Sequence, residues 1–580
     1  MLREIASFKN CLCPGLMRRP GISAGRFLRE QGYKKYAPVF SRMNPCLFLS
    51  ISSALLLALG FSSFNFPYTV WIGLVPLFFA IEGLSYKRAF AFSYLCGLLF
   101  FTASMYWLAR VTLTGWLFLS LYQGLYFGIF GIFCLMAMKV SKKGANRRVF
   151  FLALPSVWVL LEYARSNFFG GIGWNLLAYS QYRQLPLIQI ADITGAYGVS
   201  FLIVLANICV FLTLKLIFFR QDNSNDFLPA FNGGFLKGIK PRVFLSWLIL
   251  AVIFVLIFYY SRLQMSVYDT GGKKNGTTIR LSLIQANIKQ TQKWDIQYKN
   301  YILSRYKELT MQAEESGPDM IIWPETAIPG YLNKEARLMS YAEEIAKTSG
   351  ARLLLGAPMA GIDDENGFVE FNSALLYSER GQILQRYDKL RLVMFGEFIP
   401  FEKYLGALRP VLPITGNFMS GSEYTLFNLA NTGQHAFACL ICFEDIFPAL
   451  ARRFVIKGAD FMVNITNDAW FGKTSAAYQH AANSVFRAIE NRRPLVRSAN
   501  TGLTCFINKA GRIYRQINAG GKNIFVEGFI TDEIGLSPRP GFSFYTKYGD
   551  IFALICLFFT GCFMIDYTRY HKYNNKIYYN

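Results

Sequence analysis

Long apolar runs alternate with polar segments over most of this chain. The runs lie at about 46–62, 66–83, 89–109, 113–138, 149–165, 194–218, 242–260 and 549–567. Most of them approach the roughly 20 residues that a membrane-spanning helix needs. The pattern therefore predicts a polytopic α-helical membrane domain with about eight spans, seven of which precede a long polar stretch.

Residues 278–533 form that polar stretch, and their pattern is different. Ile279–Ala286 and Asp319–Trp323 have strand patterns, and the apolar spacing in Ile296–Glu315 predicts an amphipathic helix. A second helix is predicted at about 476–491. Strands mixed with helices over about 250 residues indicate an α/β layered domain.

Charge is distributed unevenly along the chain. The net charge of the 580 residues is +24, of which residues 1–277 carry about +19 and residues 278–580 about +5. The basic residues lie in alternate loops between apolar runs and not on one face, so they indicate membrane topology and argue against nucleic-acid binding. By the positive-inside rule, both termini are cytoplasmic and the α/β domain lies outside.

These patterns predict five segments. A basic cytoplasmic extension occupies residues 1–45, and seven transmembrane helices occupy 46–262. The extracytoplasmic α/β domain covers 278–533, a final transmembrane helix covers 547–568, and a cytoplasmic tail covers 569–580.

Cysteine and histidine usage argues against a disulfide framework and a metal site. Several of the eleven cysteines fall inside apolar runs, where cysteine behaves as a small hydrophobic residue. Cys439 and Cys442 spell C-x-x-C, but Leu440 and Ile441 lie between them in a strand-like run, unlike a redox or zinc motif. With only three histidines, a His-rich metal site is not expected.

Two ionisable residues stand inside the membrane half. Glu162 and Arg165 are one turn apart near the end of an apolar run, before the segment GIGW at 171–174. Ionisable residues at such a depth favour a functional role, and the alternative is a mutually satisfied pair at the membrane interface.

The stretch AFACLICFEDIFP, residues 436–448, is the first candidate for chemistry. An apolar strand pattern ends at Cys442, and acidic Glu444 and Asp445 follow. This is typical of a buried strand that delivers a side chain to a polar site at its carboxyl end. The alternative is a buried, inert cysteine.

Two other predicted strands also end in a chemically capable group. Glu325 follows the strand Asp319–Trp323, and Lys389 follows a hairpin. Thiol chemistry at a carbonyl needs a base to form the thiolate and a cation or N–H donors for the oxyanion. With histidine scarce, a carboxylate is the available base, and burial must raise its pKa toward neutrality for that role.

Four motifs, in this order, resemble the carbon–nitrogen hydrolase, or nitrilase, superfamily. They are WPETAIPG, YDKLRLVMFGEFIP, CFED, and NITNDAWFG with QH and RAIENRRPLVRSANTG. Together with the membrane spans, they make the chain similar to bacterial apolipoprotein N-acyltransferases. The resemblance implies an αββα sandwich with Glu325 as general base, Lys389 as oxyanion stabiliser and Cys442 as nucleophile.

The resemblance also implies supporting residues around that triad. Glu397 is expected to hold Lys389 or the neighbouring loop, and Glu444 to lie beside the nucleophile. The backbone N–H of Phe443 is expected to serve the oxyanion. Trp294 is expected to be a mobile loop residue above the site.

The activity that the resemblance implies is two-step acyl transfer at the bacterial inner membrane, with the catalytic domain on the periplasmic side. This implied mechanism needs no metal or organic cofactor. The expected acyl donor is a phospholipid, with phosphatidylethanolamine the expected choice. The expected acceptor is the N-terminal amine of a diacylglyceryl-cysteine lipoprotein. Two alternatives stay open: a membrane-tethered amidase that passes the thioester to water, and a non-catalytic lipid-binding or transport protein.

Overall fold

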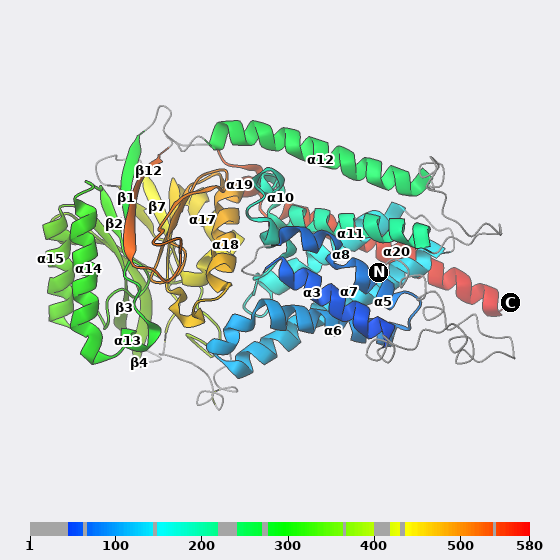
Figure 1. The fold of residues 1–580 in the computed structure, drawn as a ribbon, viewed down its shortest axis with the longest axis horizontal. Helices are drawn as coiled ribbons and strands as arrows, with labels where there is room; N and C mark the ends of the chain where they lie inside the picture. The colour runs from blue at the N-terminus through cyan, green and yellow to red at the C-terminus, as the bar shows by residue number, and fades with distance from the viewer. Residues whose placement is uncertain are drawn as a thin grey trace.

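The structure is a computed structural model. It describes residues 44–61, 66–142, 148–218, 241–269, 277–363, 367–399, 406, 418–429, 435–536 and 541–579. The predicted extension at 1–45 lies outside these ranges apart from its last two residues. Figure 1 shows a mainly helical half and a half built on strands, joined end to end.

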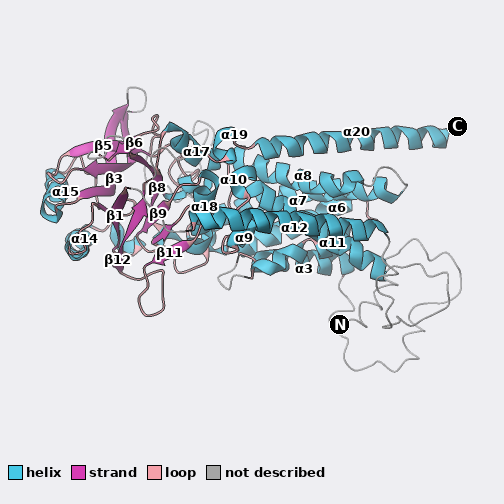
Figure 2. Ribbon diagram, turned by 90° about the horizontal axis from the view of Figure 1, so that it is seen from above, coloured by secondary structure: helices cyan, strands magenta, loops and turns pink. Residues whose placement is uncertain are grey.

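The helical half contains a helix for each apolar run of the sequence. Figure 2 shows its long helices roughly parallel to one another. The helices that correspond to the apolar runs are α3 (Pro45–Leu59), α4 (Val70–Gly73), α5 (Val75–Ile81), α6 (Tyr86–Ser104), α7 (Leu113–Lys142), α8 (Arg148–Asn167), α11 (Ala196–Phe218), α12 (Pro241–Tyr268) and α20 (Ile551–Tyr579). The short helices α9 (Leu185–Ile188) and α10 (Ala191–Thr194) lie near the joint.

Among the described residues, four helices are long and apolar enough to cross a membrane. These are Leu113–Val140, Ala196–Phe218, Val243–Tyr268 and Ile551–Lys572. Pro45–Leu59 and Pro67–Ile81 are apolar but shorter. The structure therefore establishes several membrane-type helices, and four of them reach the expected length and composition.

Two six-stranded sheets form the other half. The first has the order β12-β1-β2-β3-β4-β5 and the second β11-β10-β9-β8-β7-β6. The strands are β1 (Thr278–Gln285), β2 (Met320–Ile322), β3 (Arg352–Asp363), β4 (Gly367–Tyr377), β5 (Ile383–Asp388), β6 (Leu426–Asn428), β7 (Ala436–Ile441), β8 (Phe461–Thr466), β9 (Leu495–Ala499), β10 (Cys505–Ile507), β11 (Ile513–Gln516) and β12 (Gly528–Gly535). Parallel pairing of β1, β2 and β3, and of β7, β8 and β9, brings the carboxyl ends of neighbouring strands to one edge of each sheet.

Helices cover the outer face of each sheet, so the layers run helix, sheet, sheet, helix (Figure 1). Helices α14 (Lys299–Glu314) and α15 (Ala336–Ser349) pack on the first sheet, and α17 (Pro448–Lys457) and α18 (Ala476–Asn491) on the second. Alternation along the strands explains the layers: in β2, Met320 and Ile322 join the core between the sheets, whereas Ile321 joins the core under α14 and α15. The predicted αββα sandwich is confirmed.

Several elements lie where the sequence pattern placed them, and others were not predicted. Ile279–Ala286 corresponds to β1, and the helix at 476–491 to α18. The pattern gave no signal for β12, which pairs with β1 along all its eight residues. Pro448 begins α17, because proline suits the first turn of a helix.

Candidate active site

Cys442 lies where β7 ends and the 3₁₀ helix η9 (Cys442–Ile446) begins. Its φ of 55° is in the left-handed region, which residues with side chains rarely adopt. Its carbonyl oxygen accepts a hydrogen bond from Asn464 Nδ2 at 2.8 Å, and His480 Nε2 lies 3.3 Å away. These contacts hold a strained backbone that places a half-buried thiol at the sheet edge.

Glu325 follows β2 and is held closely against β3. A β-carbon on Gly356 would lie 2.7 Å from the Glu325 α-carbon, so only glycine admits this approach. The carboxylate is 6% exposed and accepts hydrogen bonds from Asn372 Nδ2 at 2.7 Å and from the Asn467 N–H at 3.0 Å. Two fixed donors thus orient the carboxylate that the sequence proposed as a base.

Lys389 directly follows β5 and is almost completely buried. Its Nζ donates to Glu397 Oε1 at 2.8 Å and lies 3.8 Å from Glu325 Oε1. Burial opposes its charge, but Glu397, Cys442 and Glu325 outweigh burial and raise the pKa of Lys389. Lys389 is therefore a permanent cation at the site.

The same groups affect the pKa of the Cys442 thiol. Burial and the charge of Glu325 raise the pKa of Cys442 well above its usual value, and Lys389 partly opposes them. A thiol in this state keeps its proton until a base accepts it as the reaction proceeds.

Glu397 and Asn372 connect the two charged candidates. Asn372 Nδ2 donates to Glu325 and, at 3.1 Å, to Glu397 Oε1. The second Glu397 oxygen accepts from the Val393 N–H at 2.8 Å. Glu397 therefore contacts both Lys389 and its loop, in agreement with the predicted supporting position.

Glu444 joins the Lys389 loop to the turn that carries Cys442. It is fully buried and accepts hydrogen bonds from the N–H groups of Ile441, Leu390 and Arg391, at 2.8, 2.8 and 3.0 Å, and from the Tyr387 hydroxyl. Burial raises its pKa to about 7, and these hydrogen bonds partly oppose that shift. Glu444 thus lies beside Cys442, where the sequence predicted it.

Phe443 and Trp294 are the two remaining predicted residues. The Phe443 ring packs against Lys389, with Nζ 5.5 Å from the ring centre. Trp294 directly follows the short helix α13 (Gln290–Lys293) and is 50% exposed. The expected roles of the Phe443 N–H and of Trp294 mobility stay predictions.

A buried ionic cluster lies directly behind Cys442. His480 contacts Asp468 through Nδ1 at 2.8 Å and Asp445 through Nε2 at 3.0 Å, and Arg497 binds Asp445 at 2.8 Å. Burial lowers the pKa of His480, but the two carboxylates raise it to about 9. His480 is thus protonated at neutral pH and fixes the backbone beneath the thiol.

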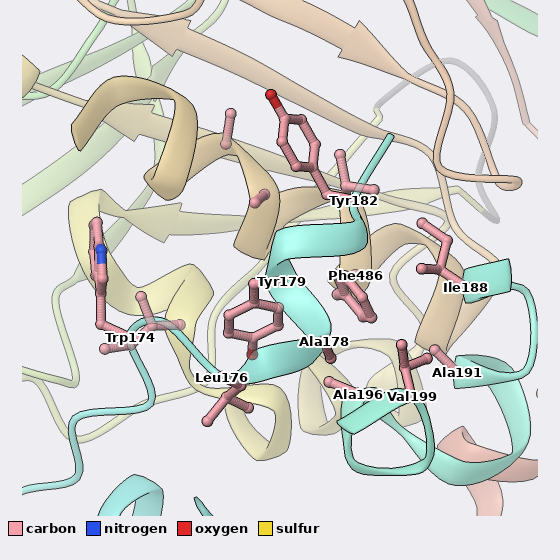
Figure 3. Packing of buried hydrophobic residues seen from close by; sticks show 14 of the residues in the cluster. Trp174, Leu176, Ala178, Tyr179, Tyr182, Ile188, Ala191, Ala196, Val199 and Phe486 are labelled. Carbon is pink, nitrogen blue, oxygen red and sulfur yellow. The ribbon is translucent and has the colours of Figure 1, made fainter. Parts of the chain in front are cut away.

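Helix α18 carries His480 of this cluster and also contacts the helical half. Gln479 Oε1 accepts from the indole N–H groups of Trp107 and Trp174, at 3.0 and 2.9 Å. The Trp174 ring packs 5.3 Å from the His480 ring. Figure 3 shows the continuing apolar contact, in which Tyr179 meets Phe486 at 5.0 Å between ring centres. The candidate site therefore rests on the joint between the two halves.

Two family profiles match the chain. Residues 53–209 match the profile described as apolipoprotein N-acyltransferase N-terminal domain, and residues 280–529 match the one described as carbon-nitrogen hydrolase. An apolipoprotein N-acyltransferase of Geobacter metallireducens is 35% identical over 515 residues, which covers 88% of this chain and 92% of that protein. The chain belongs to the apolipoprotein N-acyltransferase family.

Further members of the family share most of its length. The apolipoprotein N-acyltransferase of Chlorobaculum tepidum is 30% identical over 553 residues, covering 91% of this chain and 97% of that protein. Among solved structures, an amidase of Nesterenkonia AN1 from the nitrilase superfamily aligns with a TM-score of 0.34 and 18% identity, covering 47% of this chain and 94% of that one. So low a TM-score supports no inference about this chain.

In this member of the apolipoprotein N-acyltransferase family, the structure brings most of the predicted site residues together and leaves one at the edge of the site. Glu325, Lys389 and Glu397 meet through direct contacts, and Glu444 lies beside Cys442. Trp294 lies at the edge, half exposed. Among the described residues, no group of three or more His, Cys, Asp or Glu side chains is arranged to hold a metal ion.

Sequence reasoning missed Asn372, His480 and Lys293, which is buried at 3% exposure beside Glu325. Asn372 is a polar residue at a buried position of β4, which is a signal the pattern offered. His480 lies in a quoted motif, but its carboxylate partners are far away in sequence. Lys293 gave no signal, because a lysine at the end of a short helix is usually exposed.

Glu162 and Arg165, in α8, both hold the segment that follows them. Arg165 donates to the carbonyl groups of Trp174 and Asn175, at 2.7 and 3.0 Å, and Glu162 accepts from the Leu177 N–H at 2.8 Å. Their partners are therefore backbone groups around GIGW, which supports a structural role in presenting Trp174 to α18.

Proposed function

We propose that this protein N-acylates lipoproteins by two-step transfer through Cys442. The observation that carries the proposal is the contact of Glu325, Lys389 and Glu397 beside Cys442 in a chain of the apolipoprotein N-acyltransferase family. The position of this site at the joint with a half of apolar helices supports lipid-anchored substrates.

In the first step, Glu325 accepts the Cys442 proton and the thiolate attacks an ester carbonyl of a phospholipid. Lys389 stabilises the oxyanion, and Glu325 returns the proton to the departing lysophospholipid oxygen. The buried position of both groups supports these roles, because a low-dielectric site strengthens charge interactions. The product is a thioester on Cys442.

In the second step, the α-amino group of a diacylglyceryl-cysteine attacks the thioester. An amide forms, the C–S bond breaks, and a proton returns to Cys442 by way of Glu325. Phosphatidylethanolamine, through its first acyl chain, is the proposed donor. Supporting roles follow the contacts: Glu397 holds Lys389, Glu444 fixes the Cys442 turn, the Phe443 N–H serves the oxyanion and Trp294 gates the acceptor.

We further propose that the chain crosses the bacterial inner membrane eight times, with seven helices in 46–262 and the last in 547–568. The domain at 278–533 then lies in the periplasm, and residues 1–45 and 569–580 in the cytoplasm. The alternation of basic loops supports this topology. A reporter that is active only in the cytoplasm, fused near Gly520, should be silent, and activity of that fusion would contradict the topology.

The test of the proposed function uses the purified full chain in phospholipid vesicles with a synthetic diacylglyceryl lipopeptide. The wild type should attach an acyl chain to the lipopeptide amine, and Cys442→Ala and Cys442→Ser should not. Cys439→Ala is the matched control and should keep most activity, because Cys439 is buried in β7, three residues away. Release of free fatty acid alone would favour an amidase instead, and neither product would favour a lipid-binding protein.

A further inference from the structure

A second buried lysine lies beside the site. Lys293 ends α13 and is 3% exposed, and its Nζ donates to the backbone carbonyl of Glu325 at 3.0 Å. Within the described ranges, no carboxylate forms an ion pair with it, and the Glu325 carbonyl is its one hydrogen-bond partner.

Helix α13 is fixed over Glu325 by a second contact. Asn467 Nδ2 donates to Gln290 Oε1 at 3.0 Å, and the Asn467 N–H donates to the Glu325 carboxylate. Lys293 is therefore held close to the proposed base, and the half-exposed Trp294 follows it toward solvent.

The surroundings of Lys293 shift its protonation equilibrium toward the neutral form. Burial lowers its pKa to about 8, while the charges facing it, Glu325 after β2 and Cys442 on η9, only partly oppose that shift. Lys389 pairs with Glu397 instead. About a tenth of Lys293 is then neutral at pH 7 and about nine tenths at pH 9.

In the second half-reaction, the acceptor ammonium group must lose two protons, and Glu325 accepts only one of them. An α-amino group has a pKa of about 7.7–8.0, so at neutral pH it arrives mostly as an ammonium ion, which is no nucleophile. Glu325 takes one proton as the amine attacks and returns it to Cys442. The first ammonium proton must leave by another route, either to water before the amine enters the site or to a neutral base within it.

We propose that Lys293 is a catalytic residue that accepts this first proton, an inference that rests on the proposed function. The acceptor R–NH₃⁺ passes one proton to the Lys293 lone pair and becomes R–NH₂. The amine then attacks the thioester carbonyl, the N–C bond forms, the C–S bond breaks, and the second proton reaches Cys442 through Glu325. Lys293 finally releases its proton to water on the Trp294 side.

The experiment follows each half-reaction separately in phospholipid vesicles. Gel-shift trapping measures thioester formation, and single-turnover mixing with the lipopeptide measures transfer, both between pH 6.5 and 9.5. The variants are Lys293→Met, which removes the amine, and Lys293→Arg, which keeps a positive charge but accepts no proton at these pH values. Lys289→Met removes an exposed lysine just before α13 and is the matched control.

Lys293→Met and Lys293→Arg should form the thioester at near the wild-type rate and transfer it about five- to tenfold more slowly at pH 7, because only about a tenth of the acceptor amine is neutral there. The deficit should shrink to within about threefold at pH 9.5, where the acceptor amine is already neutral. Hydroxylamine, which is neutral at pH 7, should discharge the acyl-enzyme of every variant equally well. Lys289→Met should match the wild type.

Three results would overturn the inference: transfer at the wild-type rate in Lys293→Met, recovery of transfer by Lys293→Arg, or loss of thioester formation in folded Lys293→Met. Recovery by arginine would assign a fixed positive charge to this position. Absence of a thioester in the wild type would instead overturn the proposed function itself, so the two failures are distinguishable.

Discussion

The two sides of Cys442 each carry one buried lysine, and the two lysines are held in opposite ways. On the β5 side, Lys389 is 1% exposed and binds Glu397 at 2.8 Å. On the α13 side, Lys293 is 3% exposed and binds only a backbone carbonyl among its described hydrogen-bond partners. The pKa is raised at Lys389 and lowered to about 8 at Lys293.

Burial alone does not decide the charge state of these residues, because it is nearly equal on the two sides. The partner decides it: a carboxylate keeps Lys389 charged, and a carbonyl leaves Lys293 able to lose its proton. A permanent cation suits an oxyanion that forms in both half-reactions, whereas a titrating amine suits the movement of a proton in one of them.

The largest predicted difference is in thioester formation. Lys389→Met should slow it by about 10² to 10³-fold, because the oxyanion loses its cation. Lys293→Met should leave it nearly unchanged. Gel-shift trapping of the acyl-enzyme measures both rates. Accumulation of thioester in Lys389→Met would contradict the role of Lys389 in forming it.

Removing the negative charge of Glu397 should make Lys389 resemble Lys293, because neither lysine would then form an ion pair with a carboxylate at Glu397. In Glu397→Gln, the pKa of Lys389 should fall, because Glu397 is the largest of the charges that raise it. The protonated lysine is the active form, so thioester formation should decline at a lower pH in Glu397→Gln than in the wild type. A pH profile parallel to that of the wild type would show that Glu397 does not set this charge.

Trp294→Ala tests access on the α13 side without changing its charge. Transfer to the bulky lipopeptide should slow by about five- to tenfold while thioester still forms, because the proposed role is gating. Unlike the Lys293→Met deficit, this one should not vary with pH, and discharge by hydroxylamine should be normal. Failure of Trp294→Ala to form thioester would remove the gating role.

The remaining prediction concerns stability and not rate. The folded-state pKa of Lys293 lies below its unfolded value, so burying the ammonium destabilises the protein below pH 8, and this cost disappears as pH rises through about 10.4. Lys293→Met should therefore gain about 2 kcal/mol at pH 6, after the loss of one hydrogen bond, and less at pH 10.

Thermal unfolding in detergent at the two pH values measures that gain. Lys389→Met is the control and should lower the Tm at pH 6, because it leaves Glu397 buried without its cation. Equal shifts in both variants would mean that the two sides are not electrostatically different.

The sequence predicted most of what lies at strand ends. Glu325, Lys389 and Cys442 each follow a strand pattern, and the sandwich brings those ends together. What it did not predict depends on contacts between distant segments. Asn372 joins Glu325 and Glu397, and His480 lies between two carboxylates, through tertiary packing that no local period encodes.

The two lysines illustrate the same limit. Lys389 lies in a motif and directly after a strand, so its position was predictable. The charge state of Lys293 depends on a carbonyl 32 residues away and on the absence of an ion pair among the described residues. Neither fact is visible in the residues around it.

The most direct test of the central claim is the intact mass of the purified protein after incubation with phospholipid vesicles. The account predicts a mass increase that matches one fatty acyl chain, is removed by hydroxylamine at neutral pH and maps to Cys442. The adduct should be absent from Cys442→Ala and present in Cys439→Ala. An unmodified wild-type mass, or an acyl adduct that persists in Cys442→Ala, would contradict the account.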